Sequence, residues 1–109
     1  MQITESQNGN WTVLNLNGKV DNEGAEILQK ILTPYMTGGL VGLDFSQVEY
    51  ITSSGFRVLM VAYREQTSRG GRLLLGNMNA HVRGYFDVAG LSPHFKVVQN
   101  IYDVIAAPV

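Results

Sequence analysis

The sequence predicts an α/β sandwich, in which a small mixed β-sheet carries about four helices packed mainly on one side. Two strand-like runs joined by an Asn-Gly turn open the chain, and after them short apolar runs alternate with stretches of helical periodicity. Right-handed crossovers between parallel strands would place most helices on one face of the sheet. With 109 residues and 45% hydrophobic content, the chain is expected to form a single domain over residues 1–109.

The opening hairpin is predicted over residues 2–7 and 11–17, joined at Asn8-Gly9-Asn10. Asn and Gly both tolerate positive φ, which tight hairpin turns require. The second strand carries hydrophobic residues on both faces, with Leu14 on one and Trp11 on the other. We therefore expect Trp11 and Val13 to be covered, for example by neighbours of the first strand or by a partner.

The first helix is predicted to begin with Asp21 or Asn22 as its N-cap. Pro34 lacks a backbone donor and clashes with the preceding turn, so the helix is expected to kink or end near Thr33. The later elements are a strand over 72–76, a helix over 79–89, a strand over 95–98 and a final helix capped by Asn100 with Asp103.

The stretch from Leu40 to Gly70 holds the central elements. A hydrophobic run over 40–45 predicts a buried strand, and the residues 46–51 after it are expected to form a short loop. Two adjacent serines then precede a helix that would turn Val58, Leu59 and Ala62 toward the sheet. A hydroxyl at a helix N-terminus meets free N–H groups and a partly positive dipole end, which suits a phosphate.

Composition excludes several classes of function. The net charge is −1 and the Lys and Arg residues are scattered, so no basic face predicts nucleic-acid binding. No apolar run approaches the ~20 residues of a membrane span, and no secretory signal opens the chain. We therefore expect a cytoplasmic protein without direct membrane contact.

The sequence also lacks the residue patterns that catalysis and metal binding require. The chain has no cysteine, which excludes disulfides, thiolate zinc sites and cysteine nucleophiles. His81 and His94 lack carboxylates at ligand spacing, and neither forms a nucleophile, base and acid set with a serine. We therefore expect no catalytic residues, no metal, no cofactor and no enzyme activity.

Three segments together carry a family resemblance: residues 16–21, the run from Asp44 to Gly55, and residues 84–91. Their order and spacing resemble the STAS domain family, and most closely its bacterial anti-sigma factor antagonists. That family typically has an aspartate after the central strand, an apolar loop, and then Asp-Ser-Ser-Gly or Asp-Ser-Thr-Gly leading into a helix. Here Thr52 stands where the family usually has the second aspartate. The resemblance implies a single STAS domain over the whole chain.

The resemblance also implies a phosphorylation-switched binding module that regulates transcription by partner switching. Unphosphorylated, such a protein binds an anti-sigma factor with serine kinase activity and so releases a sigma factor. Phosphorylation ends that binding, and a serine phosphatase restores it. The alternative role within the family is that of an accessory subunit in a membrane (lipid) transport assembly, or of a signalling scaffold. Homodimer formation and nucleotide binding are left open.

Ser54 matches the serine that the kinase modifies in the family, and Ser53 is the second candidate for phosphorylation. The alternative is that both serines only cap the helix, as serine often does. Thr52 can itself be the N-cap. Its replacement of the aspartate either eases phosphorylation or marks a branch in which regulation differs.

The partner-binding surface is expected around the start of the central helix. Its aromatic and methionine residues lie opposite the sheet-facing side, so they either face solvent beside Ser54 or are covered by neighbouring helices. Asp44, like Asp21, matches an acidic family position and either contacts the partner or serves a turn or cap. Arg57 either pairs with acidic groups of the partner or is solvated. The expected partner-binding residues are Asp21, Thr52, Ser53, Gly55, Phe56, Arg57, Met60 and Tyr63.

Overall fold

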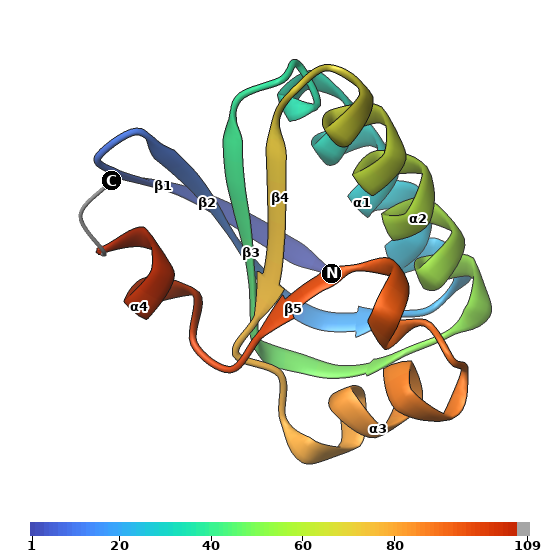
Figure 1. The fold of residues 1–109 in the computed structure, drawn as a ribbon. Helices are drawn as coiled ribbons and strands as arrows, with labels where there is room; N and C mark the ends of the chain where they lie inside the picture. Colours follow the sequence, from blue (N-terminus) through green and yellow to red (C-terminus); the bar gives the residue numbers. More distant parts are fainter. Residues whose placement is uncertain (107–109) are drawn as a thin grey trace.

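The computed structural model describes residues 1–106 and shows a five-stranded mixed sheet between two helical layers (Figure 1). The strand order is β1-β2-β3-β4-β5, with β1 antiparallel to β2 and the remaining pairs parallel. The strands are β1 (Gln2–Asn8), β2 (Trp11–Val20), β3 (Leu40–Ile51), β4 (Arg72–Gly76) and β5 (Lys96–Val98). The helices are α1 (Asn22–Leu32), α2 (Ser53–Ser68), α3 (Ala80–Val88) and α4 (Ile101–Ile105), with 3-10 turns η1 (Thr33–Tyr35) and η2 (Ser92–His94).

This arrangement confirms the predicted fold class. Helices α1 and α2 lie side by side on one face of the sheet, with α3 near the start of α2, while α4 lies on the opposite face (Figure 1). The hairpin is confirmed as well. Asn8 pairs with Trp11, so the loop is Gly9-Asn10, and Gly9 supplies the positive φ of 58°.

Strand β3 is longer than predicted, and the expected loop over 46–51 is wrong. The strand continues to Ile51, with Val48 and Ile51 paired to Gly18 and Val20 of β2 across two register shifts. Val48 and Ile51 are buried and Tyr50 is half-buried, whereas Gln47 and Glu49 are exposed. Because polar residues interrupt the apolar ones without a regular alternation, this half of the strand has the composition of a loop.

The main hydrophobic core lies between the sheet and helices α1, α2 and α3. Helix α1 contributes Leu28 and Leu32, which are fully buried. Asp21 is its N-cap and accepts a hydrogen bond from the backbone N–H of Gly24 at 2.8 Å. Pro34 ends the α-helix after Leu32 and begins η1, as its missing donor predicts.

A second, smaller core covers the other face of the sheet. Trp11 and Val13 pack there with Leu74 of β4 and Ile101 of α4. Both β2 residues are therefore covered, as expected, but by the C-terminal helix rather than by the first strand's neighbours or a partner.

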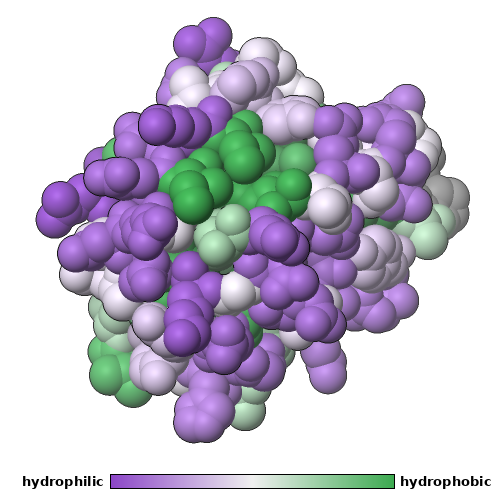
Figure 2. All heavy atoms as spheres, turned by 180° about the vertical axis from the view of Figure 1, so that it is seen from behind, coloured by the Kyte–Doolittle hydropathy of each residue, from purple (hydrophilic) through white to green (hydrophobic). Residues whose placement is uncertain are grey.

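The molecular surface is largely polar. Seen from behind, hydrophobic side chains gather near the centre of the view among hydrophilic ones, and smaller hydrophobic patches lie toward the edge (Figure 2). None of the helices within residues 1–106 is long and apolar enough to cross a membrane.

Candidate functional site

The start of α2 is fixed by Thr52, which is the N-cap residue as predicted. Its carbonyl accepts the first helical hydrogen bond, from the N–H of Phe56 at 3.1 Å. Its hydroxyl caps no helical N–H and instead donates to the carbonyl of Val20 at 3.0 Å, which also accepts from the Thr52 N–H at 2.9 Å. Thr52 thus ties the start of α2 to the end of β2.

The two serines are the first two residues of α2, and the alternative that their side chains cap the helix is wrong. Within residues 1–106, neither side chain accepts a hydrogen bond from a backbone N–H. The hydroxyl of Ser54 donates to Oδ1 of Asn22, at the start of α1, over 2.5 Å. Ser54 is half-buried and Ser53 is exposed. The Ser54 hydroxyl therefore lies at the surface where α1 and α2 both begin.

Carboxylates surround this position. A hollow of 340 Å³ beside Ser54 is lined by Asn22, Ala25, Glu26, Gln29, Ser54, Arg57 and Val58. An adjoining hollow is lined by Asp21, Asn22, Glu23 and Thr52. Three of the residues that line the two hollows are acidic, and one, Arg57, is cationic.

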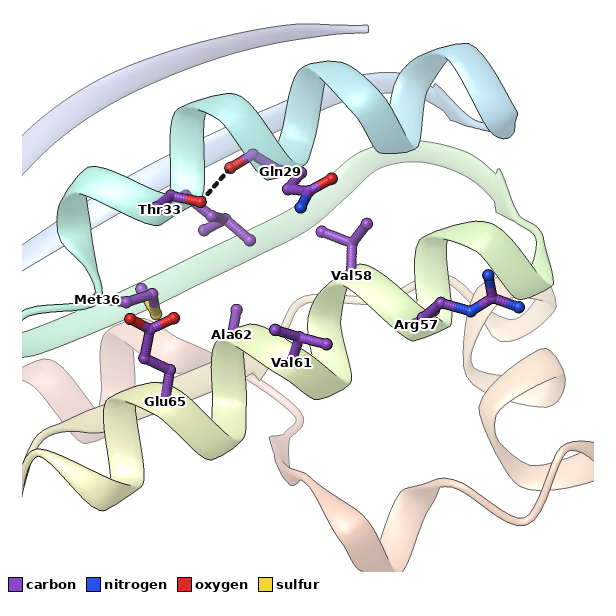
Figure 3. A pocket seen from close by; sticks show the side chains of 9 residues that line it. Gln29, Thr33, Met36, Arg57, Val58, Val61, Ala62 and Glu65 are labelled. Atoms are coloured by element: carbon purple, nitrogen blue, oxygen red, sulfur yellow. Dashed lines mark hydrogen bonds between the residues drawn. The ribbon is translucent and has the colours of Figure 1, made fainter.

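A hydrophobic groove continues from the Ser54 hollow between α1 and α2 (Figure 3). It measures 310 Å³, and it shares Gln29, Arg57 and Val58 with that hollow. Val61 is 56% exposed at its rim. The residues that line the groove are Gln29, Leu32, Thr33, Met36, Arg57, Val58, Val61, Ala62 and Glu65. The serine is thus one end of a continuous surface that has both a polar and a hydrophobic part.

The family model described as "Mlab, STAS domain" matches residues 3–99. The chain belongs to the STAS domain family. The resemblance seen in the sequence is thereby confirmed. BtrV of Bordetella bronchiseptica, assigned as an anti-sigma factor antagonist, is 28% identical over 102 residues, which cover 92% of this chain and 88% of BtrV. The anti-sigma-B factor antagonist of Bacillus subtilis is 27% identical over 92 residues, 84% of each chain.

The anti-sigma factor antagonist SpoIIAA has the same fold as this STAS domain. Its unphosphorylated form superposes with a TM-score of 0.73 at 23% identity, covering 94% of this chain and 93% of SpoIIAA. Its phosphorylated form, from Bacillus, gives a TM-score of 0.68 at 20% identity over 94% and 96% of the two chains. At these identities the likeness shows the shared fold.

Phe56, Met60 and Tyr63, expected on α2 either to face solvent or to be covered, are each half-buried in this STAS domain. Phe56 packs edge-to-face on Phe86 of α3, with ring centroids 4.9 Å apart, and Tyr63 packs on Phe95 at 5.5 Å. Met60 is half-buried with them against the main core. Neighbouring elements therefore cover part of this side of α2, while Met60 and Tyr63 also line a surface hollow beside His94.

The side of α2 that lines the groove was not predicted from the sequence. Val58 was expected to face the sheet, yet it is half-buried and lines the groove with Val61. The sequence contains a second stripe at helical spacing that could have indicated this side, and in the structure the stripe faces α1. Its residues are Val58, Val61, Ala62 and Glu65.

Gly55 serves packing rather than partner contact. It is buried, and a Cβ there would lie 2.6 Å from side-chain carbons of both Ile51 and Val20. The glycine lets the first turn of α2 sit directly on the ends of β2 and β3, and so it positions Ser54.

Asp44 lies away from the serine, in the part of the structure covered by α4. Its Oδ1 accepts from the N–H of Ser46 at 2.8 Å and its Oδ2 from the hydroxyl of Tyr102 at 2.6 Å. It is only 7% exposed, so the expectation that it contacts a partner is wrong and the turn-type bond is the correct alternative. Burial, followed by the hydrogen bond to Asp44, raises the pKa of Tyr102 to about 12.

Proposed function

We propose that this STAS domain is a cytoplasmic anti-sigma factor antagonist whose binding to an anti-sigma factor with serine kinase activity is switched by phosphorylation of Ser54. The observation that carries the proposal is the place of the Ser54 hydroxyl. It is held by one exposed side chain, Asn22, beside a hydrophobic groove. The names of the relatives support the role, and the two forms of SpoIIAA support a switch of this kind.

The chemistry in this proposal belongs to the partners. The kinase transfers the γ-phosphoryl group of ATP to Oγ of Ser54, the hydroxyl proton is lost, and ADP leaves. A serine phosphatase directs water to the phosphorus atom and releases inorganic phosphate, which restores the hydroxyl. The STAS domain itself supplies the acceptor oxygen and the surface that the kinase recognises.

Phosphorylation would change this surface without refolding the domain. The oxygen bonded to phosphorus has no proton to donate, so the bond from Ser54 to Asn22 is lost. A charge of about −1.5 to −2 then appears beside Glu26. A partner that fits the neutral hydroxyl would meet a bulky anion, which is sufficient for a local electrostatic switch.

The test uses a serine kinase that is first sought among the genes neighbouring this one. Wild type, Ser54→Ala and Ser53→Ala are each incubated with that kinase, ATP and Mg²⁺, and the products are analysed by mass spectrometry. We expect one phosphate on wild type and on Ser53→Ala, and none on Ser54→Ala. Modification of Ser54→Ala equal to that of wild type would overturn the assignment, since Ser53 or another residue would then be the acceptor.

Affinity purification separates the proposed role from the accessory role in transport. Wild type is expected to retain the soluble kinase, and the phosphorylated protein is expected to release it. Retention of a transporter ATPase in place of the kinase would contradict the antagonist role.

A further inference from the structure

Arg57 is an exposed cation in the first half of α2. Within residues 1–106 it forms no hydrogen bond and no ion pair. Two other arginines each pair with an acid one turn away. Arg69 pairs with Glu65 at 3.3 Å, and Arg83 pairs with Asp87 at 3.5 Å. On α2, the neighbours one turn from Arg57 are serines, Met60 and Val61, so nothing on its own helix neutralises it.

The side chain of Arg57 lines the same hollow as Ser54. It lines both the hollow beside Ser54 and the hydrophobic groove, and it comes three residues after the serine on α2. Residues three apart on a helix are surface neighbours, with Cβ atoms about 5–6 Å apart. Figure 3 shows the guanidinium extending past Val58, beyond the end of the groove opposite Met36 and toward the N-terminal end of α2.

The charges around Ser54 make this arginine important for a phosphate. Glu26 lines the same hollow, and Asp21 and Glu23 line the adjoining one. A phosphate on Ser54 would be repelled by these carboxylates of α1. Arg57 is the cation that lines the hollow, so it is the group within reach that could pair with the new anion.

We propose that Arg57 transmits the phosphorylation of Ser54 to the partner surface. While Ser54 is unmodified, the guanidinium is free to bind an acidic side chain of the anti-sigma factor at the mouth of the groove. The phosphate of modified Ser54 binds the same guanidinium and so withdraws it from the partner. This inference rests on the proposed function, and it adds a specific chemical requirement: the partner presents a carboxylate beside the residue that enters the groove.

The contact between Arg57 and the phosphate is tested without any partner. Phosphoserine is placed at position 54 by genetic encoding, and the second pKa of the phosphate is measured by ³¹P NMR. A nearby cation stabilises the dianion, so we expect Arg57→Gln to raise this pKa by about half a unit. Arg64→Gln is the matched control, because Arg64 is also exposed and unpaired within residues 1–106 but lines a different hollow with His94. Equal phosphate pKa values in the parent and Arg57→Gln would overturn the proposal.

The effect on the partner is tested by calorimetric titration of the anti-sigma factor kinase with four proteins. These are wild type and Arg57→Gln, each with serine and with phosphoserine at position 54. We expect Arg57→Gln to weaken binding of the unphosphorylated protein by about tenfold. We also expect phosphorylation to reduce affinity by a smaller factor in Arg57→Gln than in wild type, because the arginine can no longer be withdrawn.

The two proposals fail in different ways. If unphosphorylated wild type does not bind the kinase, the antagonist function fails, and the ³¹P result still decides whether Arg57 contacts the phosphate. If wild type binds and phosphorylation releases it, but Arg57→Gln behaves identically, the function stands and the role of Arg57 is overturned. Thermal unfolding of each variant checks that this exposed substitution leaves the fold intact.

Discussion

The hydroxyl of Tyr102 donates a hydrogen bond of 2.6 Å to the buried carboxylate of Asp44, which ties α4 to the sheet. The same hydroxyl lies 3.3 Å from Oδ1 of Asn15, and the opposite oxygen of Asp44 accepts from Ser46. Asp44 and Tyr102 are 58 positions apart in the sequence, so this bond joins α4 to the central strand β3. The bond also holds α4 over the smaller core.

Replacing Tyr102 by Phe removes the donor and leaves a buried carboxylate oxygen unsatisfied. We expect Tyr102→Phe to lower the free energy of unfolding by about 1–2 kcal/mol, measured by urea denaturation. Tyr85→Phe is the control, because Tyr85 is 42% exposed and its hydroxyl has no hydrogen bond within residues 1–106. A loss in Tyr102→Phe no larger than in Tyr85→Phe would show that the bond contributes nothing to stability.

The same tyrosine makes stability depend on alkaline pH. Burial and then the bond to Asp44 raise the pKa of Tyr102 from its ordinary value near 10 to about 12. A folded-state pKa above the unfolded value gives stability that is complete below pH 10 and is lost as the pH rises toward 12. We expect wild type to lose more stability than Tyr102→Phe over this interval, measured by urea denaturation at each pH.

Tyr35 does not confuse that comparison. Its pKa is also raised, chiefly by its hydrogen bond to Glu5, but this residue is the same in both proteins. Parallel curves for wild type and Tyr102→Phe would therefore contradict the pH prediction.

Gly55 and Gly84 are helical glycines with opposite surroundings. A Cβ at Gly55 would clash with side chains at 2.6 Å, whereas a Cβ at Gly84 would have nothing within 4 Å. We expect Gly55→Ala to destabilise the protein by about 1–3 kcal/mol through overpacking. Gly84→Ala is expected to stabilise it by about 0.5–1 kcal/mol through improved helix propensity. Thermal unfolding measures both, and equal shifts of the same sign would contradict the packing argument.

Asn22 holds the Ser54 hydroxyl in place, so it should restrain phosphorylation. We expect Asn22→Ala to raise the rate at which the kinase phosphorylates Ser54, measured at saturating STAS domain, by about two- to tenfold. The reason is that the modest hydrogen bond from Ser54 to Asn22 no longer has to be broken. Gln29→Ala is the control, since Gln29 lines the same hollow without a side-chain hydrogen bond within residues 1–106. A rate in Asn22→Ala that equals or falls below that of Gln29→Ala would refute this role for Asn22.

Features that depend on local sequence were predictable. The turn at Gly9-Asn10, the bounds of β4 and the caps at Asp21 and Asn100 follow from residue types with specific backbone preferences. The sequence also marked the place of Ser54 at the start of α2, through its resemblance to the family motif.

Features that depend on distant neighbours were not predictable. Periodicity shows that α2 has two hydrophobic sides, but only the tertiary structure shows that α3 covers Phe56 while the side toward α1 leaves a groove at Val61. The bond from Ser54 to Asn22 joins residues 32 positions apart. No local pattern signals such a pair.

The chain contains a single tryptophan, and it is buried under α4 rather than near the serine. Trp11 therefore offers a built-in fluorescent probe of one layer of the molecule. Its fluorescence emission should shift to longer wavelength when α4 detaches and water reaches the indole. Attachment of a phosphate on the far layer should leave the spectrum unchanged, so optical measurements can distinguish a local event at α2 from loosening of the whole domain.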